Sequence, residues 1–196
     1  MAVIIPPASR PQELIGFAIA HEVRNLLTPA KAYLQIGNAS AASTAIDRAL
    51  DFAEAILSSG PGGRCDVETA IRAAVDSLGT MRTVFHVEPV GAGKVGMNPS
   101  VLERVIANLA LNAAQGGAKA VRIVCFPWND RTRIQLIDDG IGHRTAPEGL
   151  SRGRGLQICA FLLDQCGGTL DVEFNAGQGT TVTIDLPVAA TSSKAA

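Results

Sequence analysis

A run of serine, glycine and proline divides the 196-residue chain into two segments with different hydrophobic patterns. The run is Ser58-Ser59-Gly60-Pro61-Gly62-Gly63, which neither a helix nor a strand accommodates. Before it, apolar residues recur at helical spacing, and after it helical and alternating patterns follow one another. The sequence therefore predicts a helical segment that a flexible linker joins to a mixed segment of helices and strands.

The first segment carries two helical patterns. One covers Gln12 to about Gly37 and the other covers about Ala42 to Leu57, with a stop signal at Gly37-Asn38. The short connection predicts an antiparallel helical hairpin. Because two helices cannot bury all of their own apolar surface, we expect the hairpin to pair with a second copy in a four-helix bundle.

The second segment predicts three helices and six strands. Asn98 and Pro99 supply an N-cap and a first-turn proline for the middle helix. The helices are expected at 66–78, 99–115 and 153–166, and the strands at 83–88, 93–97, 120–126, 132–138, 169–175 and 180–186. The fold class is therefore α+β, with helices on one face of a mixed sheet. The expected domains are 1–60 and 64–188, followed by a flexible tail at 189–196.

Composition excludes several classes of protein. Hydrophobic residues make up 47% of the chain and charged residues 18%, as in a chain with a packed core. The net charge of −1 gives no general attraction to nucleic acid, and no apolar run is long enough for a membrane span. Cys65, Cys125, Cys159 and Cys166 are scattered and form no CxxC pair, which favours a reduced, cytoplasmic compartment.

Two polar motifs lie on predicted helices. His21 stands beside Glu22, a candidate nucleophile next to a general base, and Asn25 follows one turn later where it could orient a water. Asn108 and Asn112 share one face of an otherwise apolar helix. Magnesium with phosphates is one set of partners for such amides, and a polar-edge role is the alternative.

Two further motifs are rich in glycine. Asp138-Asp139-Gly140-Ile141-Gly142 ends an apolar strand, where a carboxylate could accept from the exocyclic amine of adenine; the alternative is an ordinary Asp-Gly turn. Gly153-Arg154-Gly155-Leu156 opens a helix, whose N-terminus favours phosphate, and Gly177–Thr181 leads into the last strand. No GxGxxG follows a strand, so a Rossmann fold is disfavoured.

Taken together, these motifs resemble the sensor histidine kinases of two-component signalling. The resemblance covers about residues 12–188, and its boxes stand in the family's order: the H box at 21–25, the N box at 108–113, and three glycine boxes at 138–142, 153–156 and 177–181. It implies a dimerising hairpin that carries the phosphoacceptor histidine, followed by a Bergerat-type (GHKL) α/β sandwich that binds ATP.

The resemblance also implies a role for each residue. His21 would be phosphorylated, Glu22 would polarise it as the base, and Asn25 would place a water for dephosphorylation of a receiver. Asn112 would bind Mg²⁺, and Asn108 would support the triphosphate.

The remaining implied roles concern the nucleotide. Asp138 would bind the adenine amine, and Thr180 would support Asp138 in this contact. The glycines expected to flank the lid and the phosphates are Gly140, Gly142, Gly153 and Gly155. Arg152 and Arg154 are placed beside the phosphates by their position alone, not by a family pattern.

We therefore expect an ATP- and Mg²⁺-dependent protein-histidine kinase that is a cytoplasmic homodimer. It would autophosphorylate His21 and pass the phosphoryl group to an aspartate of a response-regulator receiver domain. A separate sensor or activator protein would deliver the stimulus, and neither nucleic acid nor a membrane span is expected.

Two departures from the family pattern keep other functions open. The segment between the first two glycine boxes, 143–152, is short, and Gly153-Arg154-Gly155-Leu156-Gln157-Ile158 lacks a third glycine. One alternative is a histidine phosphotransferase with a degenerate ATP domain that relays phosphate between receivers. A second is a non-catalytic scaffold that binds a partner through the hairpin.

Overall fold

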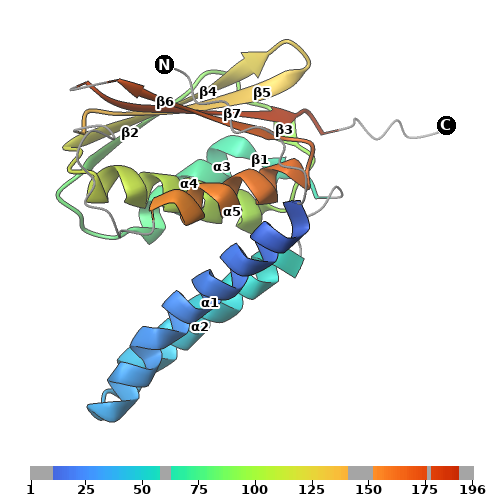
Figure 1. Cartoon of the computed structure of the whole chain (residues 1–196). Coiled ribbons are helices and arrows are strands. Elements are labelled where there is room, and N and C mark those ends of the chain that lie inside the picture. The colour runs from blue at the N-terminus through green and yellow to red at the C-terminus, as the bar shows by residue number, and fades with distance from the viewer. Residues whose placement is uncertain (1–10, 58–62, 141–151, 176–177, 190–196) are drawn as a thin grey trace.

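The computed structural model describes residues 11–57, 63–140, 152–175 and 178–189. Its first part is a helix pair, α1 (Pro11–Gln35) and α2 (Ala39–Leu57), whose helices lie side by side (Figure 1). Helix α2 begins at Ala39 rather than at the predicted Ala42. The reason is Asn38, whose side-chain Oδ1 accepts a hydrogen bond from the Ala41 N–H at 3.1 Å and so caps the helix.

The second part is a sandwich of one helical layer and one sheet. Its elements are β1 (Cys65–Asp66), α3 (Val67–Ser77), β2 (Val84–Pro89), β3 (Lys94–Val95), α4 (Pro99–Gln115), β4 (Ala120–Trp128), β5 (Arg131–Asp138), α5 (Arg152–Asp164), β6 (Thr169–Asn175) and β7 (Gly179–Pro187). Five strands form the main sheet in the order β2-β4-β5-β7-β6, and β2 is parallel to β4 while the other neighbours are antiparallel. Helices α3, α4 and α5 cover one face, which confirms the predicted arrangement (Figure 1).

One strand differs from its prediction. The sequence pattern at 93–97 predicts a five-residue strand, but β3 contains only Lys94 and Val95. These two residues pair with β1, Asp66 opposite Lys94 and Cys65 opposite Val95, in a separate two-stranded sheet. The alternating pattern did not reveal β1, because two residues directly before a helix are too short for a period-2 signal.

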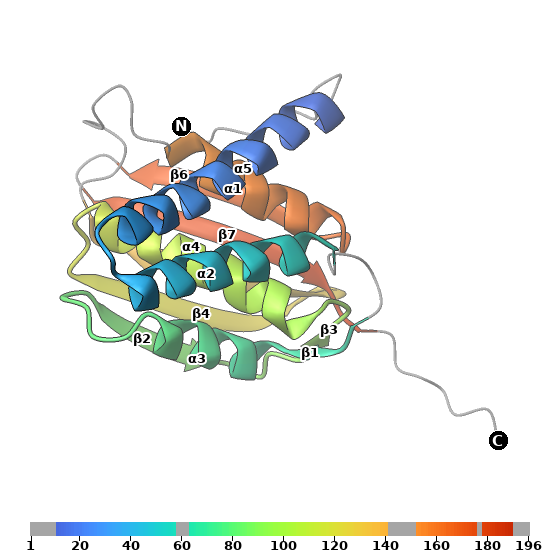
Figure 2. The same ribbon diagram turned by 90° about the horizontal axis from the view of Figure 1, so that it is seen from below.

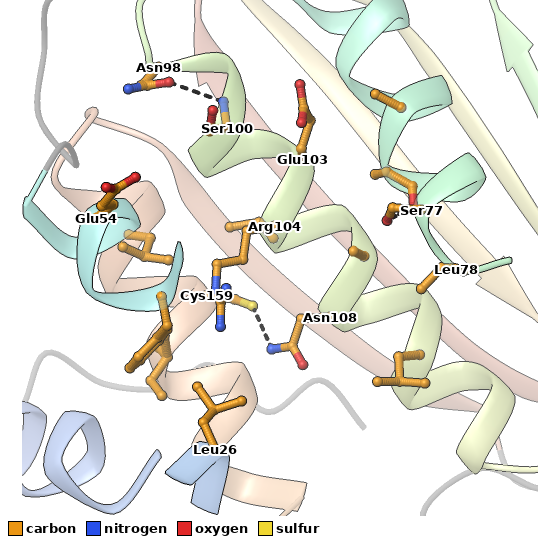
Figure 3. Close-up of a pocket in the computed structure, with 18 of the residues that line it drawn as sticks. Leu26, Glu54, Ser77, Leu78, Asn98, Ser100, Glu103, Arg104, Asn108 and Cys159 are labelled. Atoms are coloured by element: carbon orange, nitrogen blue, oxygen red, sulfur yellow. Dashed lines mark hydrogen bonds between the residues drawn. The ribbon is translucent and has the colours of Figure 1, made fainter. Parts of the chain in front are cut away.

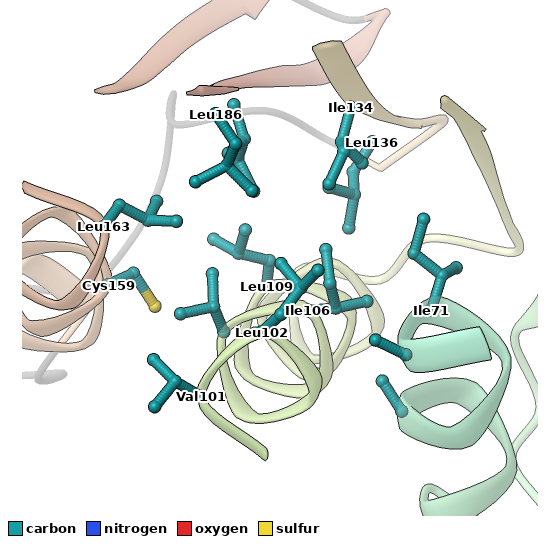
Figure 4. Close-up of a cluster of buried hydrophobic side chains, with 14 of the residues drawn as sticks. Ile71, Val101, Leu102, Ile106, Leu109, Ile134, Leu136, Cys159, Leu163 and Leu186 are labelled. Carbon is teal, nitrogen blue, oxygen red and sulfur yellow. The ribbon is translucent and has the colours of Figure 1, made fainter. Parts of the chain in front are cut away.

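The core of the sandwich lies between α4 and the sheet. Leu102, Ile106 and Leu109 of α4 face Ile134 and Leu136 of β5, and all five are buried (Figure 4). On β5 the buried residues alternate with partly exposed ones, as a strand covered on one face requires. This packing fixes α4 against the sheet and leaves the opposite side of the helix for the residues described below.

The helix pair rests on the helical layer rather than on the sheet. Helix α1 crosses α5, and α2 crosses α4 (Figure 2). The contact is apolar: Ile19, Val23 and Leu26 of α1 and Phe52 and Ile56 of α2 pack against the core of the sandwich. In the part of the chain that the structure describes, no helix combines the length and the hydropathy needed to cross a bilayer.

Candidate nucleotide site

Helix α4 organises the candidate site. It begins at Asn98, whose Oδ1 accepts from the Ser100 N–H at 3.0 Å, with Pro99 in the first turn, as predicted. Its apolar side is buried in the core, so its polar side, with Asn108 and Asn112, turns away from the sheet. Two clusters of predicted site residues contact this helix, one near its middle and one just beyond its end.

The first cluster is built around Asp138, the last residue of β5. Its Oδ1 accepts two backbone hydrogen bonds, from the Gly140 N–H at 2.8 Å and from the Thr180 N–H at 3.2 Å. Among the described residues, none donates to its second oxygen, Oδ2. The structure thus brings together three residues that the sequence assigned to one site, and it leaves one carboxylate oxygen available to a donor.

Close approach of the backbone explains two glycines of this cluster. A Cβ on Gly140 would lie 2.9 Å from Asp138 Oδ1 and 3.1 Å from the carbonyl oxygen of Gly116, directly after α4. Gly179 has φ +89°, and a Cβ there would lie 1.8 Å from the carbonyl oxygen of Asp138. Only glycine fits at 179, because β7 touches the end of β5 at this point. The sequence reasoning did not select Gly179 individually, since its contact is visible only in the paired strands.

The neighbouring carboxylate has a different task. Asp139 is exposed, and its Oδ1 accepts from the backbone N–H groups of Lys119 at 2.7 Å and Ala120 at 2.9 Å. These bonds, the one from Ala120 foremost, hold the pKa of Asp139 below its usual value. Asp139 therefore ties the end of β5 to the start of β4, and of the two adjacent aspartates Asp138 is the one placed to meet a ligand.

The second cluster joins α4 to α5. The side-chain Nδ2 of Asn108 lies 3.4 Å from the carbonyl oxygen of Gly155 and 3.3 Å from Cys159 Sγ. A Cβ on Gly155 would lie 3.1 Å from the same Nδ2. Asn108 therefore packs against the first turns of α5, where Gly155 permits the close contact. The contact with Cys159 was not predicted, because the two residues are distant in the sequence.

Asn112 lies one helical turn from Asn108 on one side and from Gly116 on the other, and so between the two clusters. Its side chain is partly buried and makes no hydrogen bond with the described residues. An amide oxygen in this state suits Mg²⁺, which takes few protein ligands and completes its shell with water and substrate phosphates. Within the described residues there is no group of three or more His, Cys, Asp and Glu side chains that could hold a metal.

Several predicted residues are placed only in part. Asn25 is exposed on α1. Gly142 lies outside the described residues. Five more predicted residues lie in described helices, but the structure does not describe their side-chain environment. They are His21 and Glu22 in α1 and Arg152, Gly153 and Arg154 in α5.

The comparisons with known proteins agree with this architecture. Residues 97–190 match the family described as histidine kinase-, DNA gyrase B- and HSP90-like ATPase. A curated relative, the sensor protein KdpD of Rathayibacter rathayi, is 30% identical over 149 residues. That match covers 66% of this chain but only 17% of the relative's own length.

Solved structures share the fold at low identity. The mycobacterial sensor histidine kinase MprB matches with a TM-score of 0.56 and 22% identity, covering 64% of this chain and 97% of its own. The ATP-binding domain of PrrB from Mycobacterium tuberculosis matches with a TM-score of 0.55 and 24% identity, and the match covers 65% of this chain and 98% of PrrB. The Acinetobacter baumannii histidine kinase AdeS matches with a TM-score of 0.59 and 17% identity, and the match covers 87% of this chain and 98% of AdeS. The predicted resemblance is thus confirmed: residues 97–190 match the ATPase family that histidine kinases share with DNA gyrase B and HSP90, and the solved structures share its fold.

Proposed function

We propose that this chain is a histidine kinase of a two-component phosphorelay. The ATPase-type domain would bind ATP with Mg²⁺, and the γ-phosphoryl group would pass to His21 and then to an aspartate of a response-regulator receiver domain. The observation that carries the proposal is the Asp138 carboxylate, which two backbone N–H groups hold through Oδ1 while Oδ2 remains available.

The nucleotide would lie along the polar side of α4. Asp138 Oδ2 would accept from the exocyclic amine of adenine, and the glycines at 140 and 179 let the backbone close around the Asp138 carboxylate and hold it in place. The amide oxygen of Asn112 would hold Mg²⁺, which neutralises phosphate charge when bound. The first N–H groups of α5, which contacts α4 through Asn108, would face the phosphates, because a helix N-terminus favours anions.

The phosphoacceptor step would take place on α1. An imidazole nitrogen of His21 would form the bond to the γ-phosphorus while the bond to the departing ADP breaks, and Glu22 would take up the proton that His21 releases. The phosphoryl group would next move to a carboxylate of the receiver, which regenerates His21. Exposed Asn25, one turn beyond His21, is the residue proposed to orient a water that hydrolyses the phosphorylated receiver and releases phosphate.

Exposed apolar residues on the helix pair support a homodimer. Ile46, Leu50 and Leu57 of α2 are 39%, 58% and 86% exposed. Their spacing of four and seven residues places them along one stripe of the helix, separate from Phe52 and Ile56, which contact the sandwich. A second helix pair would cover this stripe and give the proposed four-helix bundle.

Labelling with γ-labelled ATP and Mg²⁺ tests the kinase function directly. We expect incorporated label that is stable in base and lost in acid, and that is absent from His21→Ala. A chain that takes no label from ATP but accepts it from a phosphorylated receiver through His21 would instead be a phosphotransferase. If neither donor labels the chain, the phosphorelay function is wrong.

A matched pair of variants tests the nucleotide site. Asp138→Asn retains an oxygen for Gly140 and Thr180 but replaces the available oxygen with an NH₂ donor, which opposes the adenine amine. We expect a loss of ATP binding of about tenfold to a hundredfold, measured by fluorescence of a labelled nucleotide. Asp139→Asn is the control, because its oxygen faces β4, and it should bind as the unaltered chain does. Equal affinities for both variants would place the base elsewhere.

A further inference from the structure

A groove lies where the helix pair meets the helical layer. It has a volume of about 1190 Å³ between the helix pair and helices α3, α4 and α5, and it reaches Asn108 (Figure 3). Leu26 of α1 and Phe52 and Glu54 of α2 line the groove from the helix pair, and Ala107, Leu111 and Ile158 line it from the helical layer. The candidate nucleotide site and the surface that receives the helix pair are therefore neighbours on the same helix.

Arg104 is the residue that connects them. It lies one helical turn before Asn108, and both side chains leave α4 on the same side (Figure 3). Its guanidinium carbon stands 4.7 Å from the ring centre of Phe52, a cation–π contact between α4 and α2. Phe52 is only 1% exposed, so its ring is enclosed between the helix pair and the layer, and the partly buried Arg104 covers it from the groove.

Charge in the groove sets what else Arg104 can bind. Among the described residues that line it, Arg104 is the only basic one, whereas Glu54 of α2 and Glu103 of α4 are acidic. A polyphosphate entering from the Asn108 end would meet this guanidinium first as an attractive group. It would also meet repulsion from Glu54, which is present only while α2 is docked.

We propose that Arg104 is shared between Phe52 and the phosphates of the bound nucleotide. With the helix pair docked it lies over Phe52, and with nucleotide bound beside Asn108 it turns to the phosphates and the hold on α2 is released. Nucleotide binding and docking of the helix pair then oppose each other, and by linkage each weakens the other by the same factor. This inference rests on the nucleotide binding proposed above, and it adds a specific phosphate-binding residue and a link to the helices that carry His21.

Two substitutions separate this role from simple packing, because they move nucleotide affinity in opposite directions. Phe52→Leu keeps an apolar side chain but removes the aromatic face, so the contact that competes with phosphate for Arg104 is weakened and ATP should bind about three- to tenfold more tightly. Arg104→Met keeps the length of the side chain but removes its charge, so ATP should bind about tenfold more weakly. Both variants should loosen the helix pair, seen as faster hydrogen exchange in α2.

A residue with only a structural role would not produce this opposition. Phe85→Leu is the control, because Phe85 is a partly buried phenylalanine of β2 outside the groove, and the substitution should leave the nucleotide Kd unchanged. In the unaltered chain, saturating ATP and Mg²⁺ should speed amide exchange in the C-terminal half of α2. This measurement needs no variant and still decides the matter if Phe52→Leu does not fold.

The outcomes also separate this inference from the proposed function. If the unaltered chain binds no ATP, the proposed function fails and the sharing of Arg104 fails with it. If the unaltered chain binds ATP but Phe52→Leu does not bind it more tightly, or exchange in α2 does not change with nucleotide, the sharing of Arg104 alone is wrong.

Discussion

The helix pair and the sandwich are both largely apolar, but they bury residues of different sizes. The sandwich buries large aliphatic side chains completely; among them are Ile71, Leu102, Ile106, Ile123, Ile134, Leu163, Ile184 and Leu186. Apart from Phe52, the buried residues described in the helix pair are alanines: Ala30, Ala42, Ala45 and Ala49. Because apolar stabilisation follows the area removed from water, the sandwich can hold itself together, whereas the helix pair depends on what covers it.

Exposure shows the same contrast from outside. Leu34, Leu50 and Leu57 in the helix pair are 60%, 58% and 86% exposed. In α4, by contrast, Leu102, Ile106 and Leu109 are buried in the core. The helix pair therefore depends on partners at two separate faces, the sandwich on one and the proposed second copy on the other. The sandwich is suited to keep the nucleotide site in one geometry. The predictions below test this division, beginning with the most rigid point of the sandwich.

Gly179→Ala should be the most damaging single substitution. The new Cβ would overlap the carbonyl oxygen of Asp138, and alanine disfavours the positive φ of this position. We expect a loss of about 3–5 kcal/mol in the free energy of unfolding, measured in urea, together with loss of ATP binding. Gly93→Ala is the control, since a Cβ there meets no atom within 4 Å. A stable, nucleotide-binding Gly179→Ala chain would show that β7 and β5 do not meet as described.

Ile106→Ala should be nearly as damaging. Ile106 is fully buried between α4 and the sheet, so its truncation leaves a cavity and should cost about 2–5 kcal/mol of unfolding free energy. The matched change, Ile36→Ala, removes the same atoms from a residue that is 74% exposed at the end of the helix pair, and should cost less than about 0.5 kcal/mol. Similar costs at the two sites would mean that the helix pair is buried to the same degree as the core.

The same division explains what the sequence could predict. The elements of the sandwich follow from periodicity, because each has one buried face: β5 alternates, and α4 carries Leu102, Ile106 and Leu109 at helical spacing. The motif order pointed to the family that the comparisons match, and Asp138, Thr180 and Asn108, which it selected in β5, β7 and α4, lie in the two clusters, whereas Asn112 lies between them. The pairing of β1 with β3 could not be predicted from the sequence pattern, so β1 was missed and β3 was predicted too long.

The finer features of the site depend on three-dimensional contacts. Asp138 and Asp139 are chemically identical neighbours, and only the strand pairing shows that Asp139 is occupied by the start of β4. Likewise, the contact of Arg104 with Phe52 joins residues from the two sides of the glycine-rich linker. A clue was present, since Arg104 precedes Asn108 by one helical turn, but its partner could not be read from the sequence.

Leu50→Glu tests the proposed second partner of the helix pair. A carboxylate in the middle of the exposed stripe of α2 should weaken self-association at least about tenfold, because it would have to be buried without a counter-charge. Light scattering after size exclusion should show the mass fall from twice the chain to one chain of 20.3 kDa. Thr44→Glu, also exposed on α2 but off the stripe, should remain a dimer. A monomeric unaltered chain would contradict the bundle.

Pro29→Ala should stabilise the helix pair. Pro29 lies inside α1 and has no N–H to donate within the helix, a defect that costs up to about 3 kcal/mol in a helix interior. We expect a gain of about 1–3 kcal/mol, seen as slower hydrogen exchange in α1. Pro99→Ala is the control, because at the first turn of α4 the missing N–H has no helical partner to lose. Unchanged exchange in Pro29→Ala would show that the surrounding turns already absorb the defect.

The smallest effect concerns acid stability and returns to the sandwich. The pKa of Asp139 is lowered in the folded chain, first by the hydrogen bond from the Ala120 N–H. A carboxyl group whose pKa is lower in the folded than in the unfolded chain adds stability that is present above its unfolded pKa of about 3.9, and this stability is lost as the pH falls below that value and through the lower pKa of the folded chain. Asp139→Asn cannot titrate, so its urea midpoint should fall less between pH 6 and pH 3 than that of the unaltered chain. Parallel curves would mean that the bonds to Lys119 and Ala120 do not favour the charged form, and that Asp139 ties β5 to β4 by geometry alone.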